Sequence, residues 1–194
     1  MNPDRRDRLR DAAMEVLAEA GGRGLTHRAV DAAAGMPSDT TKNYFPSRDA
    51  LLRGVAERCV ERYREVAVRL AAAGPGPTDR EGLIALLRGL LEDIADGPGH
   101  TRLLAYLELQ AEAARRSWLA EILDPVAASD FAAFESLQRG AGLPVTRQHA
   151  AVVTLVLHGA IPHLLTRGRR TRSASGLGDL DRFVRNVLDV VYPG

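Results

Sequence analysis

Hydrophobic residues in the first part of the chain recur every three to four positions, the spacing of amphipathic helices. The pattern predicts a helix over residues 4–20, with Leu9, Ala13 and Val16 on its apolar face and glycines at 21, 22 and 24 at its end. It then predicts a short helix over residues 28–34, capped by Thr26, and a third one from residue 37 or 38 to residue 45. Three helices, two of them short, therefore open the chain.

The rest of the chain is predicted to be helical as well. A long helix from residue 48 to 73 leads to the loop Gly74-Pro75-Gly76-Pro77. Further helices are predicted after a cap at Thr78 or Asp79 and over residues 101–114, 117–139, 145–166 and 178–191. Residues 167–176 are predicted to be a loop, and Pro125 is a place where a helix could be divided or kinked.

No segment alternates polar and apolar residues as a half-buried strand does. The sequence thus predicts an all-α fold of about nine helices. A small domain of residues 1–47 would be joined by the long helix to a larger bundle within residues 48–194.

Composition places the chain among ordinary globular proteins, with 45% hydrophobic and 26% charged residues. The single cysteine, Cys59, has no partner for an internal disulfide, and we interpret it as a buried structural thiol. No apolar run approaches the roughly 20 residues of a membrane span, and the charged N-terminus does not look like a signal peptide. We therefore expect a cytoplasmic protein without membrane contact.

Net charge gives no help in finding a partner. The chain carries +1 overall, and residues 1–50 contain eight basic and eight acidic side chains. The position of the charges is more informative, because the only lysine, Lys42, lies in the third predicted helix. Nucleic-acid binding has to be argued from such positions rather than from the sum.

The two short helices over residues 26–45 have the proportions of a helix-turn-helix, in which the second helix enters the major groove of DNA. The residues themselves resemble the signature of the TetR (tetracycline-repressor-like) family. The matching segments are Gly24-Leu25-Thr26-His27-Arg28-Ala29-Val30, Ala33-Ala34-Gly35-Met36 and Thr40-Thr41-Lys42-Asn43-Tyr44-Phe45-Pro46-Ser47-Arg48-Asp49-Ala50-Leu51-Leu52. The resemblance covers about residues 5–55, and the remainder resembles the family in length and helical layout.

The resemblance implies a homodimeric regulator of transcription that binds a palindromic double-stranded DNA operator. A repressor released by a small-molecule effector is the family's usual behaviour, and no cofactor or metal is implied. Dimerisation would use the last two predicted helices, which are too apolar for isolated surface helices.

Nine residues are predicted to contact DNA. Thr26, Tyr44 and Arg48 would hold phosphates by the resemblance, and His27 is a further phosphate candidate. Base edges would be read from the set Arg28, Ser38, Thr40, Lys42 and Asn43, because Arg or Lys suits guanine and Asn suits adenine. The alternatives are a plain helix cap for Thr26, packing against the core for Tyr44, and a solvated surface position for His27 and the base-edge candidates.

The chain departs from the family pattern at several positions, one of them Lys42 or Asn43, where the family often has a tyrosine. Thr41 stands where the family usually has Leu or Val facing the small core. Asp39 replaces a common glycine and brings a negative charge near the DNA, whereas Arg48 keeps the charge of the usual lysine. These changes concern individual contacts and the operator sequence, not the fold.

An effector pocket in the bundle needs a few polar or aromatic side chains among apolar ones. The candidates are Tyr106, Gln110, Trp118, Phe134 and His158. Core packing is the alternative for each of them, and for His158 a helix bend at a dimer interface explains the position equally well.

No motif of an enzyme is present: the chain lacks a nucleophile elbow, a P-loop, a dinucleotide fingerprint and a His-Glu-x-x-His pair. Its five histidines do not pair with carboxylates at metal-ligand spacing. We therefore predict that the chain is not an enzyme and has no metal site. The remaining alternative is a helical protein-interaction adaptor whose helix-turn-helix has lost its affinity for DNA.

Overall fold

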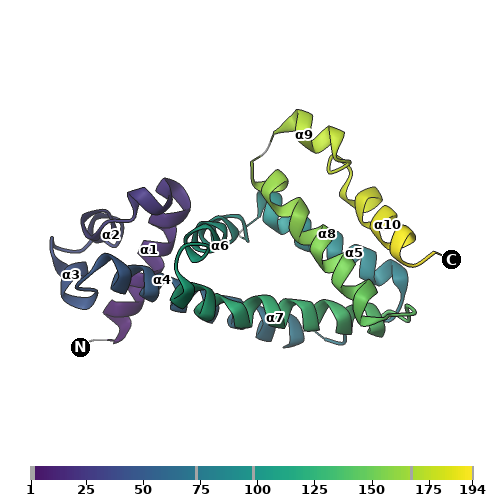
Figure 1. Cartoon of the computed structure of the whole chain (residues 1–194), viewed down its shortest axis with the longest axis horizontal. Helices are drawn as coiled ribbons and strands as arrows, with labels where there is room; N and C mark the ends of the chain where they lie inside the picture. The colour runs from purple at the N-terminus through teal and green to yellow at the C-terminus, as the bar shows by residue number, and fades with distance from the viewer. Residues whose placement is uncertain (1–2, 73, 98, 167, 194) are drawn as a thin grey trace. The chain divides into compact units, whose positions relative to one another are not determined.

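The computed structural model describes residues 3–72, 74–97, 99–166 and 168–193. Within them the chain forms ten α-helices and no strand (Figure 1), so the prediction of an all-α fold is confirmed. The helices are α1 (Pro3–Gly24), α2 (His27–Ala33), α3 (Thr40–Tyr44), α4 (Arg48–Ala72), α5 (Arg80–Asp96), α6 (Gly99–Ala113), α7 (Ser117–Gly140), α8 (Arg147–Leu165), α9 (Arg169–Ala174) and α10 (Leu180–Val191).

The contacts divide the chain into two compact units. Unit 1 holds residues 1–69 and 101–126, and unit 2 holds residues 70–100 and 127–194. Unit 1 therefore contains α1–α3, almost all of α4, most of α6 and the first part of α7. The predicted boundary at residue 47 separates a DNA-binding domain from an effector-binding and dimerisation domain. It is a boundary of function, and it stays a prediction.

The core of unit 1 joins the three N-terminal helices to α4 and α6. Leu17 of α1, Val30 of α2, Val55 of α4 and Leu109 of α6 are all buried in one cluster. Cys59 of α4 is fully buried in the same cluster, and burial raises the pKa of its thiol to about 12. The interpretation of Cys59 as a buried structural thiol is thereby confirmed.

The core of unit 2 is made by α5, α8 and α10. Leu87 of α5, Leu157 of α8 and Leu188 of α10 belong to one buried cluster. The end of the chain is held in this cluster by Tyr192, whose hydroxyl donates a hydrogen bond to Gln138 Oε1 at 2.8 Å. Both side chains are buried, so this hydrogen bond has no access to water.

Several helix boundaries differ from the predicted ones. α1 does not end at residue 20 but continues to Gly24 through a kink at Gly21, whose φ of 64° favours glycine. α7 runs through Pro125 without division. Residues 169–174, predicted to be loop, form α9, an arginine-rich helix with no buried residue and hence no apolar pattern to reveal it. Residues 73 and 167, which end and begin predicted segments, lie outside the described residues.

Candidate nucleic-acid interface

The helix-turn-helix begins with a side-chain cap on α2. Thr26 has extended backbone angles, and its Oγ1 accepts a hydrogen bond from the Ala29 N–H at 3.2 Å. This confirms the predicted N-cap and leaves the hydroxyl proton of Thr26 available to a phosphate oxygen. His27 follows at the first position of α2, and its Nε2 donates to the Phe45 carbonyl at 2.6 Å. The start of α2 and the end of α3 are thus bonded to each other.

The inner face of α3 is fixed by a buried polar pair. Asp31 Oδ1 on α2 accepts a hydrogen bond from the Thr41 N–H at 2.7 Å and a second from Thr41 Oγ1 at 2.5 Å. Asp31 is 3% exposed and Thr41 is fully buried. The Asp31 carboxylate therefore takes up a free N–H in the first turn of α3 and sets the position of α3 on α2. This pair accounts for a hydroxyl where an aliphatic side chain is usual.

The opposite face of α3 carries the exposed residues Lys42 and Asn43. Phe45, directly after the helix, is 2% exposed and packs on Gly54 of α4, where an added Cβ would come within 2.5 Å of the ring. A side chain at residue 54 would push the Phe45 ring away. The inner face of α3 is therefore anchored at Thr41 and Phe45, while Lys42 and Asn43 point to solvent.

Asp39 occupies the N-cap of α3 in the left-handed region, with φ 65°. Among the described residues it is the only one other than glycine with a positive φ. Aspartate adopts this conformation more easily than most residues, and glycine adopts it without strain. The backbone explains why glycine is common at this position, and the carboxylate of Asp39 is exposed beside α3.

The nine predicted DNA contacts lie on α2, α3, the turns beside them and the first residue of α4, all within unit 1. Six are exposed: Thr26, Arg28, Ser38, Lys42, Asn43 and Arg48. His27, Thr40 and Tyr44 are half-buried, and the Thr40 hydroxyl donates to the Pro37 carbonyl at 2.6 Å. Contact with DNA stays a prediction for all nine.

Arg48 has a structural role that the sequence did not indicate. Its Nη1 donates to the Leu25 carbonyl at 2.7 Å, and its Nη2 donates to the Gly22 carbonyl. The first turn of α4 is thereby bonded to the end of α1 and the loop that leads to α2. In addition, the Gly22 N–H donates to Glu108 Oε2 of α6 at 3.1 Å.

A network of charged residues, which we call the α1–α4 network, ties α1 to α4. Arg10 is 5% exposed and donates to Asp7 at 2.5 Å and to Glu61 at 2.8 Å. Arg58 makes a bidentate contact with Asp11 at 2.8 and 2.9 Å. Arg62 adds a further bond to Asp11, and such charge-assisted bonds are among the strongest in proteins.

The carboxyl groups of this network have shifted pKa values. The hydrogen bond from Arg10 lowers the pKa of Asp7. Burial raises the pKa of Asp11 and of Glu61, but the hydrogen bonds from the arginines outweigh burial and bring both below their ordinary values. The ionised form of the network is therefore the one that the fold stabilises.

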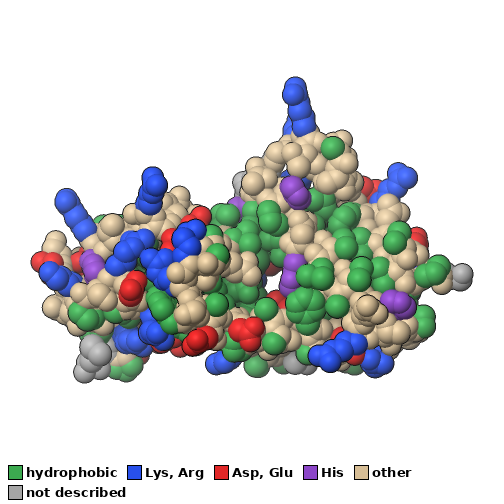
Figure 2. Space-filling model, in the orientation of Figure 1, with side chains coloured by type: hydrophobic (Ala, Val, Ile, Leu, Met, Phe, Trp, Pro, Cys, Tyr) green, Lys and Arg blue, Asp and Glu red, His purple; other side chains and the backbone are tan. Residues whose placement is uncertain are grey.

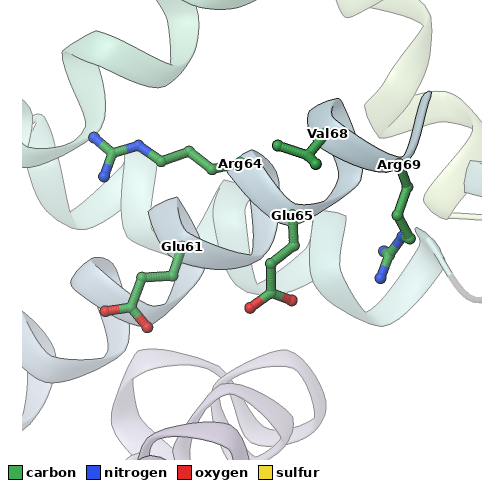
Figure 3. A pocket seen from close by; sticks show the side chains of 5 residues that line it. All are labelled: Glu61, Arg64, Glu65, Val68 and Arg69. Atoms are coloured by element: carbon green, nitrogen blue, oxygen red, sulfur yellow. The ribbon is translucent and has the colours of Figure 1, made fainter. Parts of the chain in front are cut away.

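Figure 2 shows Lys and Arg side chains, with fewer acidic ones among them, on the face of unit 1 that is turned to the viewer. Figure 3 shows a depression on the same unit, lined by Glu61, Arg64, Glu65, Val68 and Arg69, all on α4. The two glutamates in it already bind Arg10, Arg58 and Arg62, and a single helix lines the depression. It offers no enclosed place for a ligand.

The predicted pocket residues fall into both units. In unit 1, Tyr106 is buried with its ring 5.1 Å from that of Tyr63, Trp118 lies under Arg53, and Gln110 is exposed. In unit 2, Phe134 and His158 lie together with ring centroids 6.2 Å apart. Tyr106 and Trp118 thus belong to one core cluster and Phe134 and His158 form a pair in the other unit, and the role of all five residues in binding an effector stays a prediction.

Comparison with known proteins decides the family. Residues 78–190 match the family model described as Tetracyclin repressor-like, C-terminal domain, which is more than half of the chain. The chain belongs to the TetR family. Its helix-turn-helix is thus the N-terminal part of a TetR-family transcriptional regulator.

Solved structures support this membership over the whole chain. The multidrug binding protein EbrR complexed with imidazole is 28% identical, covers 100% of this chain and 97% of its own, and has a TM-score of 0.62. A TetR-family member from Streptomyces coelicolor A3 is also 28% identical, with 99% and 100% coverage and a TM-score of 0.67. A transcriptional regulator from Rhodococcus sp. Rha1, 21% identical with 95% and 96% coverage and a TM-score of 0.71, shares the fold. Among curated proteins no sequence matches the chain.

α8 is long and apolar enough to span a membrane by length and composition, but the core helix of a soluble protein meets the same test. A face of α8 is indeed buried in the core of unit 2. No group of three metal-ligating side chains occurs within the described residues.

Proposed function

We propose that this TetR-family protein is a homodimeric repressor that binds a palindromic DNA operator and is released by a small-molecule effector. The observation that carries the proposal is the two-sided recognition helix α3, anchored inside by Thr41 and Phe45 and exposing Lys42 and Asn43. A helix held in this way presents its outer side chains in a fixed direction, as reading base edges in the major groove requires.

Lys42→Ala tests DNA reading most directly. With an operator chosen by selection from random DNA, the substitution is expected to weaken specific binding by about 1–3 kcal/mol while binding to random DNA changes little. Arg64→Ala is the matched control, because Arg64 is an exposed cation about 24 Å along α4 from its first turn. Equal losses on both DNAs, with a flatter salt dependence, would assign Lys42 to phosphate instead of a base. Wild-type affinities for selected and random DNA within tenfold of each other would leave the adaptor as the better description.

The homodimer is proposed on an apolar stripe along α8. Val152, Leu155 and Val156 are 44%, 59% and 39% exposed and follow each other at helical spacing, and Val190 of α10 is 82% exposed. Figure 2 shows hydrophobic side chains gathered over this part of unit 2. Large apolar side chains grouped in this way mark protein interfaces. Leu155→Arg is expected to shift the sedimentation of the protein to that of a monomer, whereas a wild-type monomer at micromolar concentration would contradict the dimer.

The effector is proposed to be a small organic molecule bound in the C-terminal part of the chain, and the protein to be cytoplasmic and without enzymatic activity. The solved structures of EbrR with imidazole, proflavin and ethidium show that a protein similar to this one binds small aromatic compounds. If effector binding favours a dimer geometry unfit for DNA, DNA must weaken effector binding by the same factor. Titration in both directions checks this equality.

A further inference from the structure

Four side chains of unit 2 form a cluster of unusual composition between α7 and α8. We call Asp130, Phe131, Phe134 and His158 the Asp130 cluster. The imidazole ring of His158 meets both phenyl rings edge-on, with centroid distances of 5.9 Å to Phe131 and 6.2 Å to Phe134. Asp130 Oδ2 lies 3.8 Å from His158 Nε2, which is beyond hydrogen-bond length.

The carboxylate in this cluster is poorly satisfied. Burial raises the pKa of Asp130 to about 6, and burial lowers the pKa of His158, so near neutral pH a carboxylate stands beside an uncharged imidazole. Within the described residues no group donates a hydrogen bond to Asp130. Partial desolvation disfavours the charged form of this carboxyl group, and groups shifted in this way cluster at functional sites as well as in structural ion-pair networks.

The cluster is also within reach of a ligand. The side chains of Asp130 and His158 are 31% and 32% exposed, so about a third of each is open to solvent. Phe131 and Phe134 are half-buried and flank the imidazole with apolar surface. A single negative charge beside aromatic rings attracts an organic cation in two ways, through an ion pair and through contact of its body with the rings.

We infer that the Asp130 cluster binds an organic cation with a flat apolar body. The cationic group would pair with the Asp130 carboxylate, and the body would lie against Phe131 and Phe134. Leu155 precedes His158 by one turn of α8, so the bound cation would lie near the apolar stripe proposed for dimerisation. Binding itself is independent of the proposed repressor; only its regulatory consequence rests on that function.

A pair of isosteric probes tests the inference on the full-length protein by isothermal titration calorimetry. Naphthalene-2-carboxamidine carries the cation, and naphthalene-2-carboxamide has the same shape without charge. Wild-type protein is expected to bind the amidine at least about tenfold more tightly than the amide, because a hydrogen bond to a charged group is worth that much. Asp130→Asn is expected to bring the ratio close to one, and Phe134→Leu to weaken both probes.

Asp124→Asn is the matched control, since Asp124 is an exposed carboxylate on the same helix, and it is expected to leave the ratio unchanged. Thermal melting of the free protein separates a binding role from a structural one. If the Asp130 carboxylate has no stabilising partner in the free protein, Asp130→Asn is expected to keep or raise the melting temperature. If the main role of Asp130 is to stabilise His158, the substitution is expected to lower the melting temperature. A wild-type protein that binds neither probe, or binds both equally, would overturn the inference, as would a lower melting temperature together with an unchanged ratio.

A separate measurement on the operator complex distinguishes this inference from the proposed function. If the amidine binds but the affinity for DNA does not change, the Asp130 cluster is a cation site but not the site of the effector. Operator binding without amidine binding keeps the DNA-binding regulator and rejects the cation site.

Discussion

The buried pair of Asp31 and Thr41 allows a quantitative test of how the recognition helix is held. Thr41→Val keeps the shape of the side chain and removes the 2.5 Å hydrogen bond from Oγ1 to the Asp31 carboxylate. A hydrogen bond to a charged group contributes about 1.5–3 kcal/mol, and the extra buried methyl of valine offsets about 0.8 kcal/mol of that. The expected loss in the free energy of unfolding is therefore about 1–2 kcal/mol.

A double-mutant cycle isolates the interaction. Asp31→Ala leaves both the Thr41 N–H and its hydroxyl buried without an acceptor, whereas Asp31→Ala combined with Thr41→Val leaves only the N–H. The coupling energy from urea unfolding is expected to be about 1–3 kcal/mol. Thr40→Val is the matched control: the side chain of Thr40 is half-buried, but its hydroxyl bond to the Pro37 carbonyl is exposed to water, and the effect is expected within about 0.5 kcal/mol.

Additive effects would refute this reasoning. If the two single substitutions sum to the double one within about 0.5 kcal/mol, the side chains do not act as a pair. The same variants report on function, since a loosened α3 would lose affinity for the selected operator more than for random DNA. Equal affinities in wild-type and Thr41→Val protein would show that the backbone bond from residue 41 to Asp31, together with Phe45 and His27, positions α3 without the hydroxyl.

Three further predictions concern stability and reactivity. The pKa values of Asp11 and Glu61 are lowered in the folded state. The stability that the α1–α4 network contributes is therefore present above the unfolded pKa values of about 4 and is lost as the pH falls through the lower folded values. Between about pH 5 and 3 the urea midpoint of unfolding should drop less in Arg58→Gln than in wild type. Tyr192→Phe leaves the buried Gln138 Oε1 without its donor and should cost about 1–2 kcal/mol in thermal or urea unfolding, where no change would contradict that role. Cys59, buried and with its pKa raised to about 12, should react with iodoacetamide only at the rate of unfolding; rapid labelling of the native protein would show that the core opens.

How far the sequence predicted this structure depends on the range of the interactions involved. Helical spacing and caps are local, and the caps at Thr26 and Asp79 were predictable because each bonds a backbone N–H three residues on. Asp31 gave no such signal, since its partner Thr41 lies ten residues away across a turn. Arg48 looked like a phosphate ligand because of its charge, and only the fold shows that it bonds two carbonyls of the protein itself.

The predicted pocket also shows that the sequence does not reveal which residues lie close together in space. Residue type selects Tyr106 and Phe134 equally well, yet the two belong to different units. Asp130 escaped notice because an aspartate in a helix is most often a solvated surface residue. Its environment becomes visible only when α8 places His158 beside it.

The geometry of the predicted DNA-binding surface depends on more than the residues that form it. The core beneath α1–α3 is completed by Leu51 and Val55 of α4 and by Leu109 of α6. Arg48 and Glu108 then bond α4 and α6 to the same segment, through the carbonyl and the N–H of Gly22. Because Gly22, near the end of α1, is bonded to both helices, a change in how α4 and α6 pack within unit 1 would alter these bonds and with them the start of the helix-turn-helix. The helix-turn-helix is therefore positioned in part through Gly22, a residue outside α3 itself.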